Sequence, residues 1–172
     1  MSDTGLGKLC AQLDKIAAEL ETAEYMKEAG QFVRSAAVLH APKFSGYLQN
    51  NIFLDVESSD EGVTGTVYTD TSYAPYVEMG TGPKGAADHD GISPEVTPAY
   101  RMTPWWIHES DLDIGVAEFY HWPYIDTPEG RFYKCSGQPA QPFLYPALKD
   151  NEKEVLGIMQ KEINKILERS VK

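Results

Sequence analysis

Apolar residues recur every three or four positions along the first forty residues of the chain. This spacing gathers them on one face of a helix and predicts a long N-terminal helix over residues 4–40. Gly30 is expected to kink or divide this helix, and Pro42 to end it, because the residue before a proline avoids the helical region. We interpret the later apolar positions as core, and the earlier ones either as core or as a seam for a partner. The earlier positions are Leu6, Leu9, Leu13, Ile16 and Leu20.

The pattern changes to alternation after residue 50. Apolar and polar residues alternate over residues 51–57 and again over 63–69, which is typical of two half-buried strands. The polar segment 58–62 between them has the composition of a turn. The sequence therefore predicts a β-hairpin. Before it comes a turn at 43–46, where Ser45 either caps a short helical turn or leads directly into the strand.

Residues 83–136 lack a sustained period but are rich in aromatic residues, which argues against disorder. An unstructured loop of this length is uncommon in a compact domain, so we predict an ordered insertion over 84–135. Within it we expect a strand pair near Arg101–Ile107 and Gly130–Cys135. A short helix is expected over Leu112–Tyr120, beginning near Asp111 or Asp113.

Helical spacing returns over residues 142–170 and predicts a C-terminal helix with Pro142 in its first turn and Pro146 near the start of its longer run. The elements together indicate the α+β class in a single domain over 1–172. We expect a long N-terminal helix, a small antiparallel sheet built on the hairpin, and a C-terminal helix packed on that sheet. The ordered insertion lies between the sheet and the last helix.

The net charge of −11 is concentrated in the middle of the chain. Residues 55–130 contain 15 acidic residues and two basic ones, Lys84 and Arg101, for a local net charge of −13. Such a segment repels phosphate, so tight DNA binding is disfavoured and at most passive contact with DNA is expected. The charge is either a solvated surface or an acidic face or lumen that lets DNA pass.

Composition also indicates in which cellular compartment the protein is made. The chain has no apolar run of about 18 residues and no signal-peptide pattern at its start, which predicts a soluble protein made in the cytoplasm, without a membrane partner. Cys10 and Cys135 lie far apart in the sequence. Free thiols are therefore expected rather than a disulfide.

Three local patterns resemble chemical motifs without meeting their requirements. Segment 80–85 is rich in glycine but matches neither the phosphate loop nor the dinucleotide fingerprint. The carboxylates and histidines of 88–113 are residue types that bind zinc or manganese, but they lack a known ligand spacing. Cys135 and His121 form a nucleophile–base pair only if the fold brings them together. We expect no enzyme, catalytic residue, metal site or cofactor, and keep a small metal-dependent hydrolase or nuclease as an alternative.

Two segments about fifty residues apart combine aromatic residues, prolines and glycines: 73–82 and 137–148, which we call the signature segments. They form the two ends of the insertion, and we expect them to lie close together in space. Such segments build rigid surfaces, and aromatic residues are common anchors of protein interfaces. Phe143 is favoured as core, and at least one of the adjacent tryptophans is expected to point outward. The interface candidates are Tyr73, Tyr76, Glu78, Gly80, Gly82, Trp105, Trp106, Trp122, Gln138, Pro142 and Phe143.

Several motifs carry a resemblance to a known family. They are His40-Ala41-Pro42, Phe44-Ser45-Gly46-Tyr47-Leu48, the predicted hairpin, Tyr73-Ala74-Pro75-Tyr76-Val77-Glu78-Met79-Gly80-Thr81-Gly82 and Gln138-Pro139-Ala140-Gln141-Pro142-Phe143-Leu144-Tyr145-Pro146-Ala147-Leu148. Together they resemble the tail-component or neck protein family of long-tailed double-stranded DNA phages, over residues 5–83 and 136–170. Family members usually have an Asp or Ser-Thr-Gly turn where this chain has Phe44-Ser45-Gly46.

The resemblance implies an α+β fold and a structural role in the virion neck or tail, in head–tail joining or tail completion. The implied partners are further copies of the chain in a ring around the DNA channel, a connector or head-completion protein, and a tail tube or terminator protein. Assembly would take place in the host bacterial cytoplasm. The family supplies no catalytic residues. A different interpretation of the same sequence is an adaptor that binds a host protein through the tryptophan-rich insertion.

Overall fold

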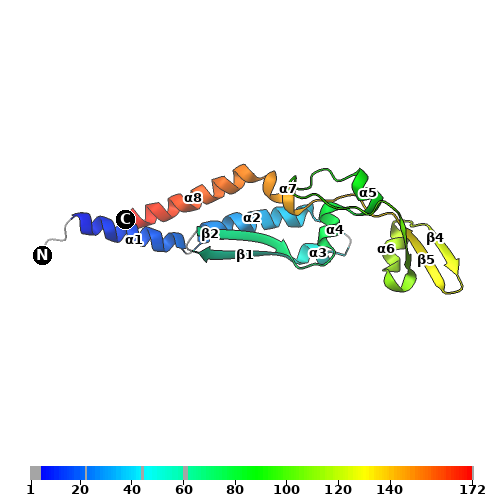
Figure 1. Ribbon diagram of the computed structural model, residues 1–172. Coiled ribbons are helices and arrows are strands. Elements are labelled where there is room, and N and C mark those ends of the chain that lie inside the picture. Colours follow the sequence, from blue (N-terminus) through cyan, green and yellow to red (C-terminus); the bar gives the residue numbers. More distant parts are fainter. Residues whose placement is uncertain (1–4, 22, 44, 60–61, 172) are drawn as a thin grey trace. The chain divides into compact units, whose positions relative to one another are not determined.

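The computed structural model describes residues 5–21, 23–43, 45–59 and 62–171 (Figure 1). The chain divides into two compact units, Met1–Thr71 with Phe143–Lys172, and Ser72–Pro142. We call them the frame and the middle unit, and describe each by itself. The α+β class is confirmed. The single domain with an insertion at 84–135 stays a prediction, and the middle unit contains that range.

The frame begins with two helices of equal length, α1 (Gly5–Glu21) and α2 (Glu24–His40). The expected division of the N-terminal helix is present, but its expected place at Gly30 was wrong. Ala23 adopts a left-handed conformation with φ of 59°, and its carbonyl oxygen accepts the N–H groups of Met26 and Lys27 at 3.0 Å to start α2. Gly30 lies inside α2, where a Cβ atom would sit 2.5 Å from Leu54 Cδ1. Glycine there lets the Leu54 side chain pack closely against α2 and does not bend the helix.

The hairpin is confirmed as β1 (Ile52–Ser59) and β2 (Gly62–Thr69), antiparallel, with Ile52 opposite Thr69 and Ser59 opposite Gly62. Residues 60 and 61 of the expected polar loop lie outside the described residues. The turn before the hairpin carries a short helix, α3 (Tyr47–Asn50), and the Tyr47 N–H donates to Ser45 Oγ at 3.3 Å. Phe44, expected in the same turn, also lies outside the described residues.

The predicted C-terminal helix is divided into α7 (Leu144–Lys149) and α8 (Glu152–Val171). The expectation of one helix from 142 was wrong, and Pro142 precedes α7. The break follows turn chemistry at Asp150-Asn151: the Asn151 side-chain amide donates to Ala147 O at 3.0 Å, and its backbone N–H donates to Leu148 O at 3.2 Å. In a continuous helix, these two carbonyl oxygens would instead accept the backbone N–H groups of residues 151 and 152.

Helix α2 is the central layer of the frame, with the hairpin against one side and α7 and α8 against another (Figure 1). Met26, Gly30 and Arg34, four residues apart, face the hairpin. The Met26 side chain lies against Gly65, and the Leu54 side chain lies against Gly30. Arg34 Nε donates to Ile52 O at 2.7 Å. The last helix was expected on the sheet. Instead α2 covers the hairpin, and α8 packs on α2 and α1.

Small residues make this packing close. Ala29, Val33 and Ala37, again four apart on α2, are buried, as is Ala147 of α7. Small side chains allow helix axes to approach. Phe143 and Ile52 are the largest fully buried side chains among the described residues. Phe143 therefore lies in the core, as favoured from the sequence.

The middle unit starts with two short helices that the sequence analysis did not predict, α4 (Ala74–Met79) and α5 (Gly82–Ala87). A three-stranded antiparallel sheet follows, built from β3 (Trp105–His108), β4 (Tyr124–Thr127) and β5 (Gly130–Cys135), with β5 in the middle. The predicted pairing of the tryptophan strand with Gly130–Cys135 is confirmed; β4 was missed. Helix α6 (Ile114–Phe119) confirms the predicted short helix, and Asp113 caps it by accepting the Gly115 N–H at 3.0 Å.

Candidate functional site

The two signature segments meet, as predicted, in an isolated antiparallel bridge between Thr81 and Gln138. The Thr81 N–H donates to Gln138 O at 2.9 Å, and the Gln138 N–H donates to Thr81 O at 3.1 Å. Further bonds extend the pairing on both sides. The Gln138 side-chain amide donates to Tyr76 O at 2.9 Å, and the Gln141 N–H donates to Val77 O at 2.8 Å. We call residues 76–85 and 136–141 together the clamp.

Glycine is required in the clamp by close backbone approach. Gly82 has φ of 62°, and a Cβ atom there would lie 2.9 Å from Ser136 O and 3.0 Å from the Trp105 ring. Gly137 has φ of 77°, and a Cβ atom there would collide with the Thr81 carbonyl oxygen. A side chain at either position would strain the backbone and separate the two segments. The clamp is therefore a fixed platform rather than a mobile loop.

The glycine-rich stretch 80–85 uses its backbone donors inside the protein. The N–H groups of Thr81, Lys84 and Gly85 donate to the carbonyl oxygens of Gln138, Ser136 and Thr81, respectively. A phosphate loop needs such donors aimed at its ligand. These donors instead hold the clamp together.

A cavity of about 620 Å³ opens beside the clamp, entirely within the middle unit. This volume lies within the range of about 300–1,000 Å³ that is usual for ligand pockets. Its walls are mostly apolar and aromatic. The principal side chains are those of Tyr76, Met79, Tyr100, Arg101, Trp105 and Trp122. We call this cavity the aromatic pocket.

Local bonds fix the walls of the aromatic pocket. The Tyr100 hydroxyl donates to Met79 O at 2.7 Å, which ties segment 98–101 to α4. The Arg101 guanidinium lies 5.3 Å from the centre of the Trp105 ring, in a cation–π arrangement. The backbone N–H of Trp122 donates to Ala117 O at 2.9 Å, just after α6. Within the part of the chain that the structure describes, Arg101 takes part in no salt bridge.

The interface candidates fall into three groups. Tyr76, Gly80, Gly82, Trp105, Trp122 and Gln138 line the aromatic pocket. Tyr73 and Trp106 are exposed, while Glu78 and Pro142 are half-buried. The third group is Phe143 alone, which is fully buried in the frame. The structure thus gathers six of the eleven around one cavity, and their role in binding stays a prediction.

Sequence reasoning missed the contribution of segment 98–101 to this site. Pro98, Tyr100 and Arg101 belong to an irregular stretch with no period, so no pattern linked them to the tryptophans. One signal was available: Arg101 is one of only two basic residues in 55–130, four residues before a tryptophan. An isolated cation beside aromatic residues is a recognisable cation–π candidate.

Several of the residues considered for metal chemistry are engaged in structural hydrogen bonds. His108 Nε2 donates to Glu129 O at 3.0 Å, and His108 Nδ1 accepts the Ser110 N–H at 3.1 Å. Glu109 Oε1 accepts the Arg131 N–H at 3.1 Å. In the described ranges, no group of three or more His, Cys, Asp or Glu side chains is placed to hold a metal ion. Burial raises the pKa of the Cys135 thiol, which opposes formation of the reactive thiolate.

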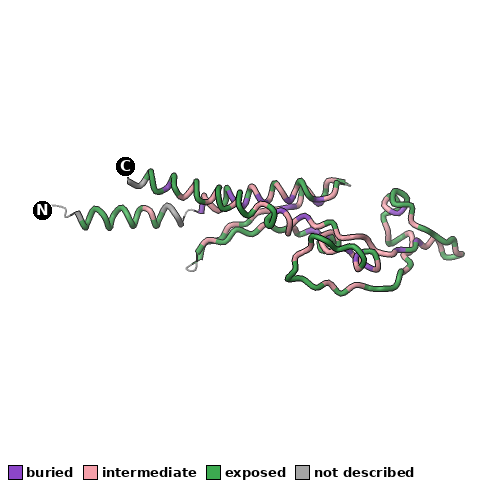
Figure 2. The backbone as a smooth tube through the Cα atoms, turned by 90° about the horizontal axis from the view of Figure 1, so that it is seen from above, coloured by how far each residue is buried: buried purple, intermediate pink, exposed green. Residues whose placement is uncertain are grey.

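Helix α1 displays a second surface of interest, in the frame. Leu6, Leu9 and Leu13 are 71%, 51% and 56% exposed, and Figure 2 shows the described part of α1 mostly as exposed. Their spacing of three and four residues is that of a coiled-coil seam. The sequence left the role of these positions open between core and seam. Their exposure excludes the core of the chain itself, and we call them the leucine stripe.

The comparison with known families matches the first part of the frame and the start of the middle unit. Residues 7–80 match the family described as "Bacteriophage HK97-gp10, putative tail-component". The resemblance to phage tail components is thereby confirmed over α1, α2, α3, the hairpin and α4. The expected resemblance over 136–170 stays a prediction. No curated protein and no solved structure matches the chain.

The tail-component family indicates a structural protein of the phage tail and, with it, a place in the virion. Most of the aromatic pocket lies beyond the matched residues, since only its α4 wall falls inside them. The likeness to tail components thus rests on the first part of the frame and on α4, and most of the pocket lies outside it. In the described part of the chain, no helix is both long and apolar enough to cross a membrane.

Proposed function

We propose that the protein is a non-enzymatic structural protein of the phage neck or tail that joins head to tail or completes the tail. In this role it is a subunit of a ring around the DNA channel, between a connector or head-completion protein and a tail tube or terminator protein. The match of residues 7–80 to the tail-component family carries the proposal. Assembly takes place in the cytoplasm of the host bacterium.

The leucine stripe supports self-association. Three exposed leucines on successive turns of one helix form an apolar strip that monomeric proteins usually cover. The stripe spans only eight residues, little more than one heptad, so one such contact is weak alone. In a closed ring, every subunit makes the contact twice, and the weak contacts support one another. We assign the stripe to a neighbouring copy of the chain.

The acidic segment supports the passage of DNA. Of the 15 acidic side chains in residues 55–130, those on β1, on segment 88–95 and around α6 are exposed. They include Asp55, Glu57, Asp88, Asp90, Glu95, Asp113 and Glu118. Negative side chains along a channel repel phosphate and prevent DNA from adhering. Exposed carboxylates of either unit that face the channel of a ring would let DNA slide.

The test is assembly with neck components. Purified protein is analysed by mass photometry alone and with connectors or tail tubes of the same phage, and the mixtures are imaged by negative-stain electron microscopy. We expect rings in solution, or rings that form only on a connector or a tail tube. A chain that stays monomeric under all of these conditions and binds neither structure would contradict the proposal.

A further inference from the structure

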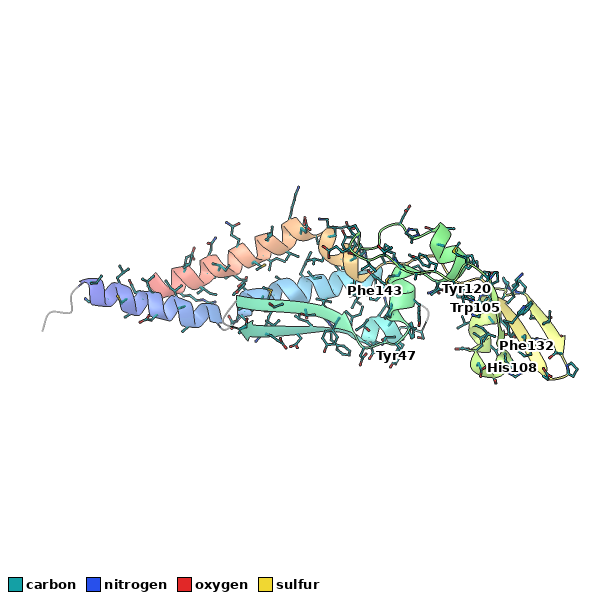
Figure 3. All side chains as sticks on the ribbon, in the orientation of Figure 1. Tyr47, Trp105, His108, Tyr120, Phe132 and Phe143 are labelled. Atoms are coloured by element: carbon teal, nitrogen blue, oxygen red, sulfur yellow. The ribbon has the colours of Figure 1, made fainter. Side chains whose placement is uncertain are left out.

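The tip of α6 carries two adjacent exposed aromatic rings. Phe119 and Tyr120 are 65% and 57% exposed, and their ring centroids lie 5.0 Å apart with an angle of 87° between the planes. This edge-to-face arrangement is the favoured geometry for an aromatic pair, so the two rings form one preformed unit. We call it the aromatic knob. Figure 3 labels Tyr120 together with Trp105 of the aromatic pocket.

The backbone holds the aromatic knob at a fixed place. The Tyr120 N–H donates to Val116 O at 3.1 Å, and the following His121 N–H donates to Glu118 O at 3.1 Å. α6 ends at Phe119, and His121 has φ of 51°, a left-handed conformation that changes the chain direction directly after the knob. Large apolar rings presented on a short, capped helix bind with little loss of conformational freedom. The knob is built as an anchor.

The aromatic pocket is a receptor of matching chemistry. Its walls combine aromatic rings with a single charged side chain, Arg101, in a segment whose net charge is −13. The Arg101 guanidinium already stacks on Trp105 and forms no salt bridge within the described residues. The pocket therefore favours an aromatic ligand that brings a carboxylate with it. Glu118, exposed and next to Phe119, supplies such a carboxylate at the aromatic knob.

We propose that the aromatic knob of one copy of the chain docks into the aromatic pocket of a second copy, with Glu118 of the first facing Arg101 of the second. The occupant is a second copy because each chain carries both halves of the pair, with complementary charge. In the structure the knob remains exposed, so it does not fill the pocket of its own chain. This inference rests on the proposed ring function and names a contact between its subunits.

The pairing has a defined symmetry. Knob and pocket are different surfaces of the same unit, so their contact is heterologous (head-to-tail). A dimer formed by one such contact still has a free knob on one subunit and a free pocket on the other. Such a contact continues from subunit to subunit until a ring closes. Charge reversal on either surface should therefore block growth, because every link in the ring uses the same two surfaces.

The first experiment removes the aromatic knob. The double substitution Phe119→Ala and Tyr120→Ala is compared with Tyr47→Ala, which removes a ring as exposed as that of Tyr120 from α3 of the frame. Assembly is followed by mass photometry over a concentration series, with connectors present as templates. We expect the midpoint concentration for assembly to rise at least tenfold for the knob variant and to stay unchanged for the control. Unchanged assembly of a folded knob variant, or an equal loss in Tyr47→Ala, overturns the inference.

The second experiment reverses the charges. Arg101→Glu and Glu118→Arg should each weaken assembly, because each variant then brings two like charges together at every contact with a copy of itself. The chain with both substitutions should recover most of the assembly, since opposite charges face each other again. No recovery in a folded double variant contradicts the direct facing of these two residues.

A mixture of the two single variants gives an independent readout of the same contact. The knob of the Glu118→Arg chain meets the altered pocket of the Arg101→Glu chain, and the unaltered knob of the latter meets the unaltered pocket of the former. Both contacts join opposite charges, so the mixture should assemble with alternating subunits where neither variant assembles alone. A mixture of folded variants that assembles no better than its components overturns the pairing.

The third experiment identifies the occupant. A photo-crosslinking amino acid, p-benzoylphenylalanine, replaces Tyr120, and the crosslinked products are mapped by mass spectrometry. Crosslinks to residues 98–105 of a second copy support the inference, and crosslinks only to the connector or tail tube overturn it. If the unmodified chain fails to assemble even on connectors and tail tubes, the proposed function itself fails. If it assembles and the knob variant assembles equally well, only the knob-and-pocket contact fails.

Discussion

The helices α1 and α2 have the same length, 17 residues each, and both have an apolar face, yet the two faces differ in exposure. On α2 the face consists of Ala29, Val33 and Ala37, all buried. On α1 the corresponding positions are leucines, and Leu9 and Leu13 are more than half exposed. The larger side chains are outside and the smaller ones inside.

The difference shows that a helical period alone does not separate a buried apolar face from an exposed one. α2 is packed by the hairpin, α7 and α8, which leaves room only for small residues. α1 contacts α8 but leaves Leu6, Leu9 and Leu13 exposed, where we propose that a neighbouring copy covers them. A pattern of equal period thus predicts a helix in both cases but does not predict what covers it.

The strongest test of this contrast places the same charge on each helix. Val33→Asp puts a carboxylate into the core face of α2, and we expect it to lower the free energy of unfolding by about 3–5 kcal/mol, because the charge is buried without a partner. Leu9→Asp on α1 should change that free energy by less than about 0.5 kcal/mol, as is usual for exposed positions. Urea unfolding followed by circular dichroism measures both. Similar losses in the two variants would remove the distinction.

The next test concerns assembly. Leu9→Asp combined with Leu13→Asp leaves the monomer folded but should prevent self-association through the leucine stripe, since two carboxylates then face the neighbouring copy. Gln12→Asp, which adds a charge at an exposed position beside the stripe, serves as the control and should assemble normally. Mass photometry with connectors present gives the readout. Normal rings from the double variant would show that the stripe is not a subunit contact.

A smaller effect is expected where α2 meets the hairpin. Arg34→Met keeps much of the side-chain volume but removes the hydrogen bond from Nε to Ile52 O. The expected loss in free energy of unfolding is about 0.5–1.5 kcal/mol, the usual contribution of one hydrogen bond. Lys27→Met, at an exposed position of the same helix, is the control. An equal, near-zero change in both variants would mean that this bond does not fix the hairpin on α2.

The smallest perturbation is chemical labelling, which leaves stability unchanged. Cys10 lies exposed on α1, whereas Cys135 is buried and the pKa of its thiol is raised by that burial. A maleimide should therefore modify Cys10 rapidly and Cys135 slowly in the free protein, because the thiolate is the reactive form. Assembly should slow the labelling of Cys10. Rapid labelling that persists in assembled rings would place α1 away from the subunit contact. The Cys10→Ser variant is the control, because any labelling that it shows comes from Cys135.

Local patterns predicted the elements that depend on local chemistry. Alternation located the hairpin, and Asp113 marked the start of α6. The division of the N-terminal helix was placed wrongly because the role of Gly30 depends on Leu54, a residue distant in the sequence. The break between α7 and α8 had a local signal in Asp150-Asn151 that the apolar period outweighed. The turn Pro128-Glu129 was likewise a local signal for β4, which it joins to β5.

The candidate site was predicted in part. The aromatic residues of the two signature segments and the tryptophans were identified, and the meeting of those segments is confirmed by the Thr81–Gln138 bridge. The pocket itself was not predictable, because it depends on where the irregular segment 98–101 crosses α4. Tyr100 reaches Met79 O through a contact that no periodic pattern encodes. Tertiary position, not residue type, creates the cavity.

The bridge between Thr81 and Gln138 also has a consequence for protein engineering. It joins two points far apart in the sequence, so the chain between them is a loop that is closed at its base. In a flexible loop, each doubling of length adds only about 0.6 kcal/mol of closure entropy. Foreign sequence grafted beyond the bridge, such as an epitope at the exposed Pro128-Glu129 turn, should therefore leave α2 and the hairpin folded. The clamp makes this chain a scaffold for display.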